Sequence, residues 1–332
     1  MHLRCCTRLP FLLALVALVA TGPLALTASA QSPYPSRPVK LVVGYAPASG
    51  ADVVARLIAN RLTDSLKQPF VVENKPGAGG AIAAQEFVRA PADGHTLMLA
   101  AMPQMIINFA ATPKPRFDPM RDFAPVAQIV SVDLVLAINP QKVPAATLKE
   151  FIAWSQKQPV TFFGTPGPGT VGHFLAVMFG DTAKTKVEPV HFKATNDSLT
   201  ALLGGDIHAL FVPYTVAAAQ IKAGKLRALA VTGRARAPMF PDTPTVKDAG
   251  YPDLEAGSWY GVFAPASTPQ DILDKLSAEV VQAAQSPDTK AKFEDAGMSV
   301  TALNRAEFAR AMKGDLTRWG QVVKATGFTT QE

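Results

Sequence analysis

The sequence predicts an α/β fold made of two α/β sandwich lobes that are joined by two crossings of the chain. From Val39 onward, apolar runs of strand length alternate with amphipathic helical patterns, which is typical of a mostly parallel sheet covered by helices. The alternation occurs in two sets, separated by a connecting stretch near residues 125–135. A second apolar connection near residues 254–264 predicts the second crossing.

The first thirty residues differ from the rest and are excluded from the fold. A short basic segment, "MHLRCCTR", precedes a long apolar segment, and Ala28-Ser29-Ala30 supplies the small residues that precede a cleavage site. This layout predicts a secretory signal peptide over residues 1–30, cleaved after Ala30, and therefore export to the periplasm. A membrane anchor is the alternative, but Gly22 and Pro23 interrupt the apolar segment.

Charge and cysteine content exclude several classes of function. Arg4 and Arg8 leave with the signal peptide, so the formal net charge falls from +6 to +4. The remaining basic residues are scattered, which does not indicate a nucleic-acid partner. Cys5 and Cys6 are the only cysteines and lie in the signal peptide, so the mature chain has neither a disulfide nor thiol chemistry.

Lobe 1 is predicted to comprise residues 31–130 and 256–332. Its first elements alternate in type and are, in order, the strand "PVKLVVGY", a helix from near Asp52, the strand "PFVVEN", the turn "KPGAGG", the helix "AIAAQEFVRA" and the strand "HTLMLAA". Two C-terminal helices are expected to return to the same sheet. One starts at Thr268-Pro269, a cap followed by a proline in the first helical position, and the other starts at Asn304.

Lobe 2 is predicted to comprise residues 131–255. Its first helix, "TLKEFIAWSQ", opens with Thr147 and Glu150 at the spacing of a capping box. Strands and helices then alternate in the order "VTFFGTP", "HFLAVMF", "VEPVHF", "DSLTALLGG", "HALFVPY", a helix that ends at "IKAG", and "LRALAVTG".

No catalytic residue, metal site or cofactor is predicted. Residues 167–172 match G-x-G-x-x-G, but a dinucleotide site also needs an acidic residue about 20 residues further on, at the end of the next strand. Glu188 opens that strand instead, and Pro168 lies between the first two glycines. The sequence has no H-E-x-x-H motif for a metal and no G-x-S-x-G motif for a hydrolase. An exported esterase or dehydrogenase is the alternative function.

The turns from strand to helix are the candidate binding site, because a helix N-terminus presents backbone N–H groups to an anion. In open α/β sheets such turns meet at the carboxyl ends of the strands. The first turn, "YAPASGAD", has no lysine of the kind that phosphate-binding loops use, so it suits a compact carboxylate. Ser49 has two interpretations that the sequence does not separate, a hydroxyl donor to the anion and an ordinary residue of the helix start.

Four segments carry a resemblance to a known family: "YPSRPVKLVVGYAPASGADVVARLIANRL", "QPFVVENKPGAGGAIAAQEFVRAPADGHTLMLA", "QIKAGKLRALAVTG" and "FPDTPTVKDAGYPDLEAGSWYGVFAPASTP". They resemble the Bug-type extracytoplasmic solute receptors, the binding subunits of tripartite tricarboxylate transporters, from Tyr34 to the C-terminal helix. The resemblance implies the two-lobed periplasmic binding protein fold, called the Venus flytrap, and a small carboxylate ligand. It also implies delivery to membrane transporter subunits or to a sensor kinase, and we expect a monomer.

The resemblance further implies which residues contact the ligand. In the family, main-chain N–H groups and waters of the first turn hold the carboxylate, and a glycine loop of the other lobe faces them. The residues at the matching positions are Tyr45, Ala48, Ser49, Gly50, Ala51, Asp52, Ala101, Met102, Gln104, Thr165, Gly169, Thr170, His173, Phe192, Val212 and Tyr214.

The first turn departs from the family pattern P-G-G-x-[TS]-D, because Ser49 replaces a glycine and Ala51 replaces a hydroxyl residue. Val212 stands where many members have an aspartate, which could pair with a ligand ammonium. Valine cannot, so we predict that the protein disfavours amino acids and prefers a carboxylate with an uncharged or aromatic body, with Tyr45, Phe192 and Tyr214 as apolar walls. The alternative is that Val212 only packs the end of its strand.

Overall fold

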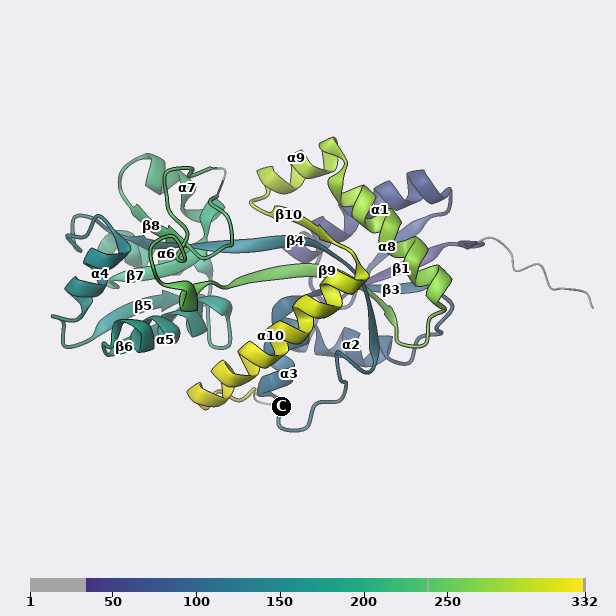
Figure 1. Cartoon of the computed structure of the whole chain (residues 1–332), viewed down its shortest axis with the longest axis horizontal. Coiled ribbons are helices and arrows are strands. Elements are labelled where there is room, and N and C mark those ends of the chain that lie inside the picture. Colours follow the sequence, from purple (N-terminus) through teal and green to yellow (C-terminus); the bar gives the residue numbers. More distant parts are fainter. Residues whose placement is uncertain (1–33, 238, 331–332) are drawn as a thin grey trace, which may run out of the picture. The chain divides into compact units, whose positions relative to one another are not determined.

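Strand β4 (Phe123–Ile138) connects two groups of strands, because its two halves have different partners. The computed structural model describes residues 34–237 and 239–330, and the predicted signal peptide lies outside the described residues. Residues 123–133 of β4 pair antiparallel with β9 (Gly257–Pro265), and Figure 1 shows these two strands side by side. From Leu134 onward, β4 pairs antiparallel with β7 (Ala209–Pro213) and β8 (Arg227–Val231).

The first group of strands is parallel at one edge and antiparallel at the other. Strands β2 (Phe70–Asn74), β1 (Val39–Val43) and β3 (Thr96–Ala101) are adjacent and parallel, as the alternation of strands and helices predicts. β9 then pairs antiparallel with β3, and β10 (Ser299–Leu303) pairs antiparallel with β4. The helical segments of this group are α1 (Gly50–Leu66), η1 (Ala78–Gly80), α2 (Ala81–Phe87), η2 (Pro103–Ile107), α3 (Asn108–Ala111), α8 (Gln270–Gln285), α9 (Pro287–Asp295) and α10 (Arg305–Thr326).

The second group has its parallel strands in the order β7, β5 (Thr161–Thr165) and β6 (Val187–His191). Its helical segments are α4 (Leu148–Ser155), α5 (Val171–Ala183), α6 (Thr195–Gly204), α7 (Tyr214–Lys222) and η3 (Pro252–Leu254). β4 changes partner between residues 133 and 134, and β9 begins at Gly257. These positions lie close to the predicted lobe boundaries at residues 130 and 255, and the division into lobes stays a prediction.

The core of the fold consists of large side chains with almost no exposed surface. Phe151, Phe163 and Phe179 are each fully buried, and the ring centroids of Phe163 and Phe179 are 4.9 Å apart. Burying one such side chain contributes about 1.5–3 kcal/mol. Strand β3 is buried at every residue from Leu97 to Ala101, so both of its faces are covered, as its continuous apolar run predicts.

Several helix ends follow the local sequence. Asn304 and Glu307 form the complete capping box of α10, and the Thr147 side chain accepts from the Glu150 amide at the start of α4. The prediction for α8 was wrong by one residue: Pro269 is its N-cap, and the Thr268 hydroxyl donates to the carbonyl of Pro265. We also did not predict α9, which is separated from α8 because Pro287 cannot continue the preceding helix.

Candidate functional site

The turn between β1 and α1 is held by a network of short hydrogen bonds. Ala48 has a left-handed backbone conformation (φ 64°), and its amide donates to Asp52 Oδ2 at 2.9 Å. The Asp52 amide donates to Ser49 Oγ at 3.3 Å, so Ser49 is the N-cap of α1. The Ser49 oxygen is therefore used as an acceptor within the turn, while its hydroxyl hydrogen can still be donated to an anion.

The buried carboxylate of Asp52 organises this turn from within. Besides the Ala48 amide, it accepts from Arg56 Nε at 2.9 Å and from Asn74 Nδ2 at 2.9 Å. Asn74 Nδ2 also donates to the carbonyl of Tyr45 at 3.1 Å. The hydrogen bond from Arg56 lowers the pKa of Asp52 below its usual value. Asp52 therefore acts on the shape of the turn, and Arg56 compensates its charge.

Two tyrosine hydroxyls belong to the surroundings of this turn. A Cβ at Gly50 would lie 2.9 Å from the hydroxyl oxygen of Tyr260, so that hydroxyl lies against the first residue of α1. Burial raises the pKa of Tyr260, and burial together with the neighbouring Tyr260 raises the pKa of Tyr45. Both hydroxyls are therefore protonated, neutral donors near pH 7. Sequence reasoning missed Tyr260, which β9 places opposite Ala101 of β3.

The turns after β1, β2 and β3 pack directly against one another. A Cβ at Gly44 would lie 2.7 Å from Gly80 Cα, and a Cβ at Gly80 would lie 2.6 Å from Gln104 Cδ. Gln104 Nε2 donates to the Gly80 carbonyl at 2.8 Å, while its buried Oε1 has no hydrogen-bond partner among the described residues. Glycine is required at position 80, because φ there is 92° and no side chain would fit. Met102, next to this contact, is fully buried.

The glycine loop between β5 and α5 forms the corresponding turn of the second group. Thr170 caps α5 by accepting from the His173 amide at 3.3 Å, and its hydroxyl donates to the Gly167 carbonyl at 2.8 Å. The Gly169 amide donates to His173 Nδ1 at 3.1 Å. Burial, with a smaller contribution from His191, lowers the pKa of His173 to about 4. The imidazole is therefore neutral near pH 7, and it holds the loop as an acceptor.

Thr165, His191, Phe192 and Phe328 contact one another or the loop residues. Thr165 Oγ1 lies 2.6 Å from His191 Nδ1, and the ring centroids of His191 and His173 are 5.0 Å apart. The Phe192 amide donates to the Thr165 carbonyl at 2.9 Å. Phe328, near the C-terminus, has its ring centroid 5.9 Å from that of His173. Sequence reasoning missed His191 and Phe328, and no local pattern around either residue signals the contact.

Val212 lies at the end of β7, Tyr214 is the first residue of α7, and both are buried. Val212 has 0% exposed surface, is paired with Val135 of β4, and packs in an apolar cluster that also contains Leu210. This arrangement corresponds to the alternative in which Val212 packs the strand end. Burial raises the pKa of Tyr214, whose hydroxyl interacts with Ser299 of β10.

Exposure divides the predicted ligand contacts into two sets. Those with partly or fully exposed surface are Tyr45, Ala48, Ser49, Gly50, Gly169, Thr170, His173 and Phe192. Those that are buried are Ala51, Asp52, Ala101, Met102, Gln104, Thr165, Val212 and Tyr214. In this conformation a solute can touch only the first set, and the second set supports it. The role of each residue in binding stays a prediction.

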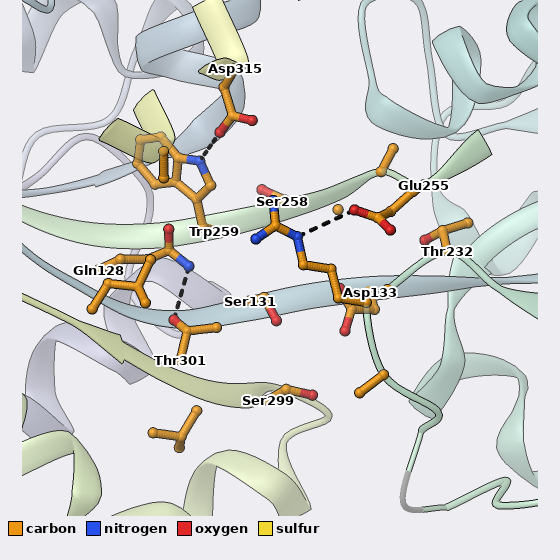
Figure 2. Close-up of a pocket in the computed structure, with 18 of the residues that line it drawn as sticks. Gln128, Ser131, Asp133, Thr232, Glu255, Ser258, Trp259, Ser299, Thr301 and Asp315 are labelled. Atoms are coloured by element: carbon orange, nitrogen blue, oxygen red, sulfur yellow. Dashed lines mark hydrogen bonds and ion pairs between the residues drawn. The ribbon is translucent and has the colours of Figure 1, made fainter. Parts of the chain in front are cut away.

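A cavity of about 320 Å³, here called the β4–β9 cavity, is lined by none of the predicted contacts. Figure 2 shows that strands β4, β9 and β10 and helix α10 surround it. Asp315 accepts from Trp259 Nε1 at 2.8 Å, and Arg234 pairs with Glu255 at 3.2 Å. Burial raises the pKa of Asp133, another lining residue, to about 6. Its three acidic residues, Asp133, Glu255 and Asp315, are matched in number by Arg234, Arg236 and Arg318, so its charge does not exclude an anion. The turns described above are the better candidate site for a carboxylate because two helix N-termini lie there.

Over the described ranges, no group of three or more His, Cys, Asp or Glu side chains is arranged to hold a metal ion. A search of the same ranges finds no helix with the length and hydropathy of a membrane span.

Comparisons with known proteins agree over nearly the whole chain. The family model described as "Tripartite tricarboxylate transporter family receptor" matches residues 54–328. Protein BugT of Bordetella pertussis is 31% identical over 311 residues, which cover 93% of this chain and 95% of BugT.

Solved structures are similar as well. MatC from Rhodopseudomonas palustris with bound malate is 31% identical with a TM-score of 0.69, over 87% of this chain and 100% of that one. Rpa4515 of R. palustris with adipate is 29% identical with a TM-score of 0.73, over 89% of this chain and 99% of that one.

Proposed function

Because this chain belongs to the tripartite tricarboxylate transporter receptor family, we propose that it is a periplasmic solute-binding protein that captures a small dicarboxylate. The family consists of transporter receptors, which bind solutes and catalyse no reaction. The chain has the mixed α/β fold of periplasmic binding proteins, which confirms the fold class predicted from the sequence.

The first turn is the observation that supports a carboxylate ligand most directly. It brings the N-terminus of α1, the Ser49 hydroxyl and the Tyr260 hydroxyl to one place. A helix N-terminus favours a negative group, and the uncharged hydroxyls add hydrogen-bond donors without requiring a lysine. The Asp52 charge does not oppose the ligand fully, because Arg56 pairs with it at 2.9 Å.

The glycine loop supports a second carboxylate group at the other end of the ligand. It presents the N-terminus of α5 beside the neutral His173. Two anion-favouring turns suit a ligand with two acidic ends better than a monocarboxylate. The relatives with bound malate and adipate each hold a dicarboxylate. This chain is proposed to bind one of the same chemical class.

We assign the protein to the periplasm and expect it to deliver its ligand to membrane subunits of a transporter or to a sensor kinase. Closure of the two lobes around the ligand would create the form that these partners recognise, because each lobe supplies only part of the donors. Scattering with and without saturating ligand tests closure, and an unchanged radius of gyration with a tightly bound dicarboxylate would contradict it.

Calorimetry with succinate, malate and adipate tests the function. We expect binding of at least one of them and none of the dimethyl esters, which keep the shape and lose both charges. The Tyr260→Phe variant should weaken binding about tenfold or more, because a hydrogen bond to a charged group contributes about 1.5–3 kcal/mol. Tyr251→Phe, a partly exposed tyrosine beyond both turns, is the matched control. Equal affinities of ester and acid would overturn the proposal.

A further inference from the structure

The segment that follows α10 lies directly against the glycine loop. A Cβ at Gly169 would lie 2.7 Å from Phe328 Cζ and 3.0 Å from Phe328 Cε1, so the ring occupies the space that a side chain at position 169 would need. Gly169 also has a left-handed backbone (φ 75°). The loop can therefore approach the ring this closely only because residue 169 is glycine.

The Phe328 ring also contacts the start of α5. Its centroid is 5.9 Å from that of His173 and 5.5 Å from that of Phe174, with interplanar angles of 70° and 87°. These are edge-to-face arrangements, which are favourable for aromatic pairs. The ring thus touches both residues of the hydrogen bond from the Gly169 amide to His173 Nδ1. It covers the interaction that sets the shape of the loop.

The same C-terminal segment is also hydrogen-bonded to the end of helix α3, which belongs to the first group of elements. The Thr330 amide donates to the Ala111 carbonyl at 3.1 Å, and the hydroxyls of Thr330 and Thr112 are 2.9 Å apart. Ala111 ends α3, the helix that continues from the turn carrying Gln104. Residues 327–330 therefore connect the turn after β5 with the helical segment after β3, and both turns belong to the candidate site.

We propose that Phe328 is a positioning residue for ligand binding, which holds the glycine loop and His173 in the conformation that receives the carboxylate. The inference rests on the proposed function. Without the ring, Gly167 and Gly169 leave the loop free to take many backbone conformations, and the ligand has to order it on binding. With the ring in place, that ordering is already complete, so the ligand binds more tightly.

Linkage makes the effect reciprocal. If the docked segment favours the ligand, the bound ligand must favour the docked segment by the same factor. The amide of Thr330, which is hydrogen-bonded only when the segment is docked, should then exchange more slowly with solvent when the protein is saturated with ligand.

The experiment compares the Phe328→Ala variant with a matched loss of an aromatic residue elsewhere. Trp154→Ala is the control, because Trp154 is also partly buried and packs against the same apolar cluster, but its ring contacts are Phe151 and His208. Calorimetry with malate or succinate should show about tenfold weaker binding for Phe328→Ala and an unchanged affinity for Trp154→Ala, although both variants melt at lower temperature. Phe328→Tyr should restore wild-type affinity.

Nuclear magnetic resonance of the His173 ring separates this inference from the proposed function. Removing the Phe328 ring should hydrate His173 and raise its pKa from about 4 towards 6.5, with no ligand present. If wild-type protein binds no dicarboxylate but this titration changes, the ligand assignment fails and the contact stands. If Phe328→Ala leaves both the His173 titration and the affinity unchanged, the positioning role is wrong. Should Phe328→Ala not fold, Phe328→Leu is measured in the same way.

Discussion

Replacing Asp52 by alanine should both destabilise the protein and weaken ligand binding, because this carboxylate is the centre of the first turn. The side chain is 4% exposed and accepts hydrogen bonds from the Ala48 amide, Asn74 Nδ2 and Arg56 Nε. In Asp52→Ala the Ala48 amide and Asn74 Nδ2 lose this acceptor, and the left-handed conformation of Ala48 keeps only the turn hydrogen bond from the Ser49 amide to the Ala46 carbonyl. The turn should therefore lose the shape that presents the N-terminus of α1.

The size of the effect follows from the individual bonds. Hydrogen bonds to a charged group contribute about 1.5–3 kcal/mol each. The Arg56 side chain is 53% exposed, so its ion pair with Asp52 adds at most about 1 kcal/mol. Counting only the bonds from Ala48 and Asn74 at the lower value gives a loss of about 3 kcal/mol, which lowers the melting temperature of a domain of this size by about 6 °C.

Differential scanning calorimetry and titration with malate measure the two effects. Asp64→Ala, an exposed aspartate on the same helix, is the matched control and should change neither quantity. The pH dependence gives an independent check. Because the folded pKa of Asp52 is lowered, its stabilisation is present above the unfolded value of 3.8 and is lost as the pH falls below it. A melting temperature and an affinity of Asp52→Ala equal to those of Asp64→Ala would refute the reasoning.

Three further predictions concern single positions. Ala48→Gly should raise the free energy of unfolding by about 1 kcal/mol, because alanine pays for a left-handed backbone that glycine adopts freely, and a lower melting temperature would argue against it. The wild-type protein should gain at most about 3 kcal/mol in its free energy of unfolding as the pH falls from above 6 to below 3.8, and Asp133→Asn should lack this gain. The sign follows because the folded carboxyl binds its proton more tightly than the unfolded one. Urea unfolding of the wild type and Asp133→Asn at several pH values measures the difference in stability. A difference that does not change with pH contradicts the prediction. Val212 is buried in this conformation, so the preference for succinate over aspartate predicted from the sequence requires Val212 to reach the ligand in the closed form. Calorimetry with the two ligands tests it, and tighter binding of aspartate would overturn it.

Local features of the fold were predictable where neighbouring residues alone determine them. The capping box of Asn304 and Glu307 formed because its hydrogen bonds lie within one helical turn. Apolar runs flanked by turn residues gave β1, β2 and β3 and the helices between them, because the alternation of strand and helix is itself a sequence pattern. The break at Pro287 was equally local and was overlooked.

Part of the candidate site was predictable for the same reason. Ser49 and Thr170 cap the helices that follow them, and each could be placed from its position before an amphipathic run. The family resemblance supplied the rest of the predicted contacts, but sequence did not reveal which are exposed. Asp52 and Gln104 are buried and hold the turns, whereas Ala48 and His173 are at the surface or close to it.

The sequence by itself thus determined the α/β class and the alternation of strands and helices apart from α9, and it placed helix starts in the turns after β1 and β5. Tertiary structure alone decided that β4 changes partner at Leu134, that Tyr260 lies against Gly50, and that Phe328 lies on Gly169. The last two contacts join residues that are far apart along the chain. Their positions depend on strand register and on the packing of α10, and no short sequence pattern encodes either, because such contacts form only when the whole core is assembled.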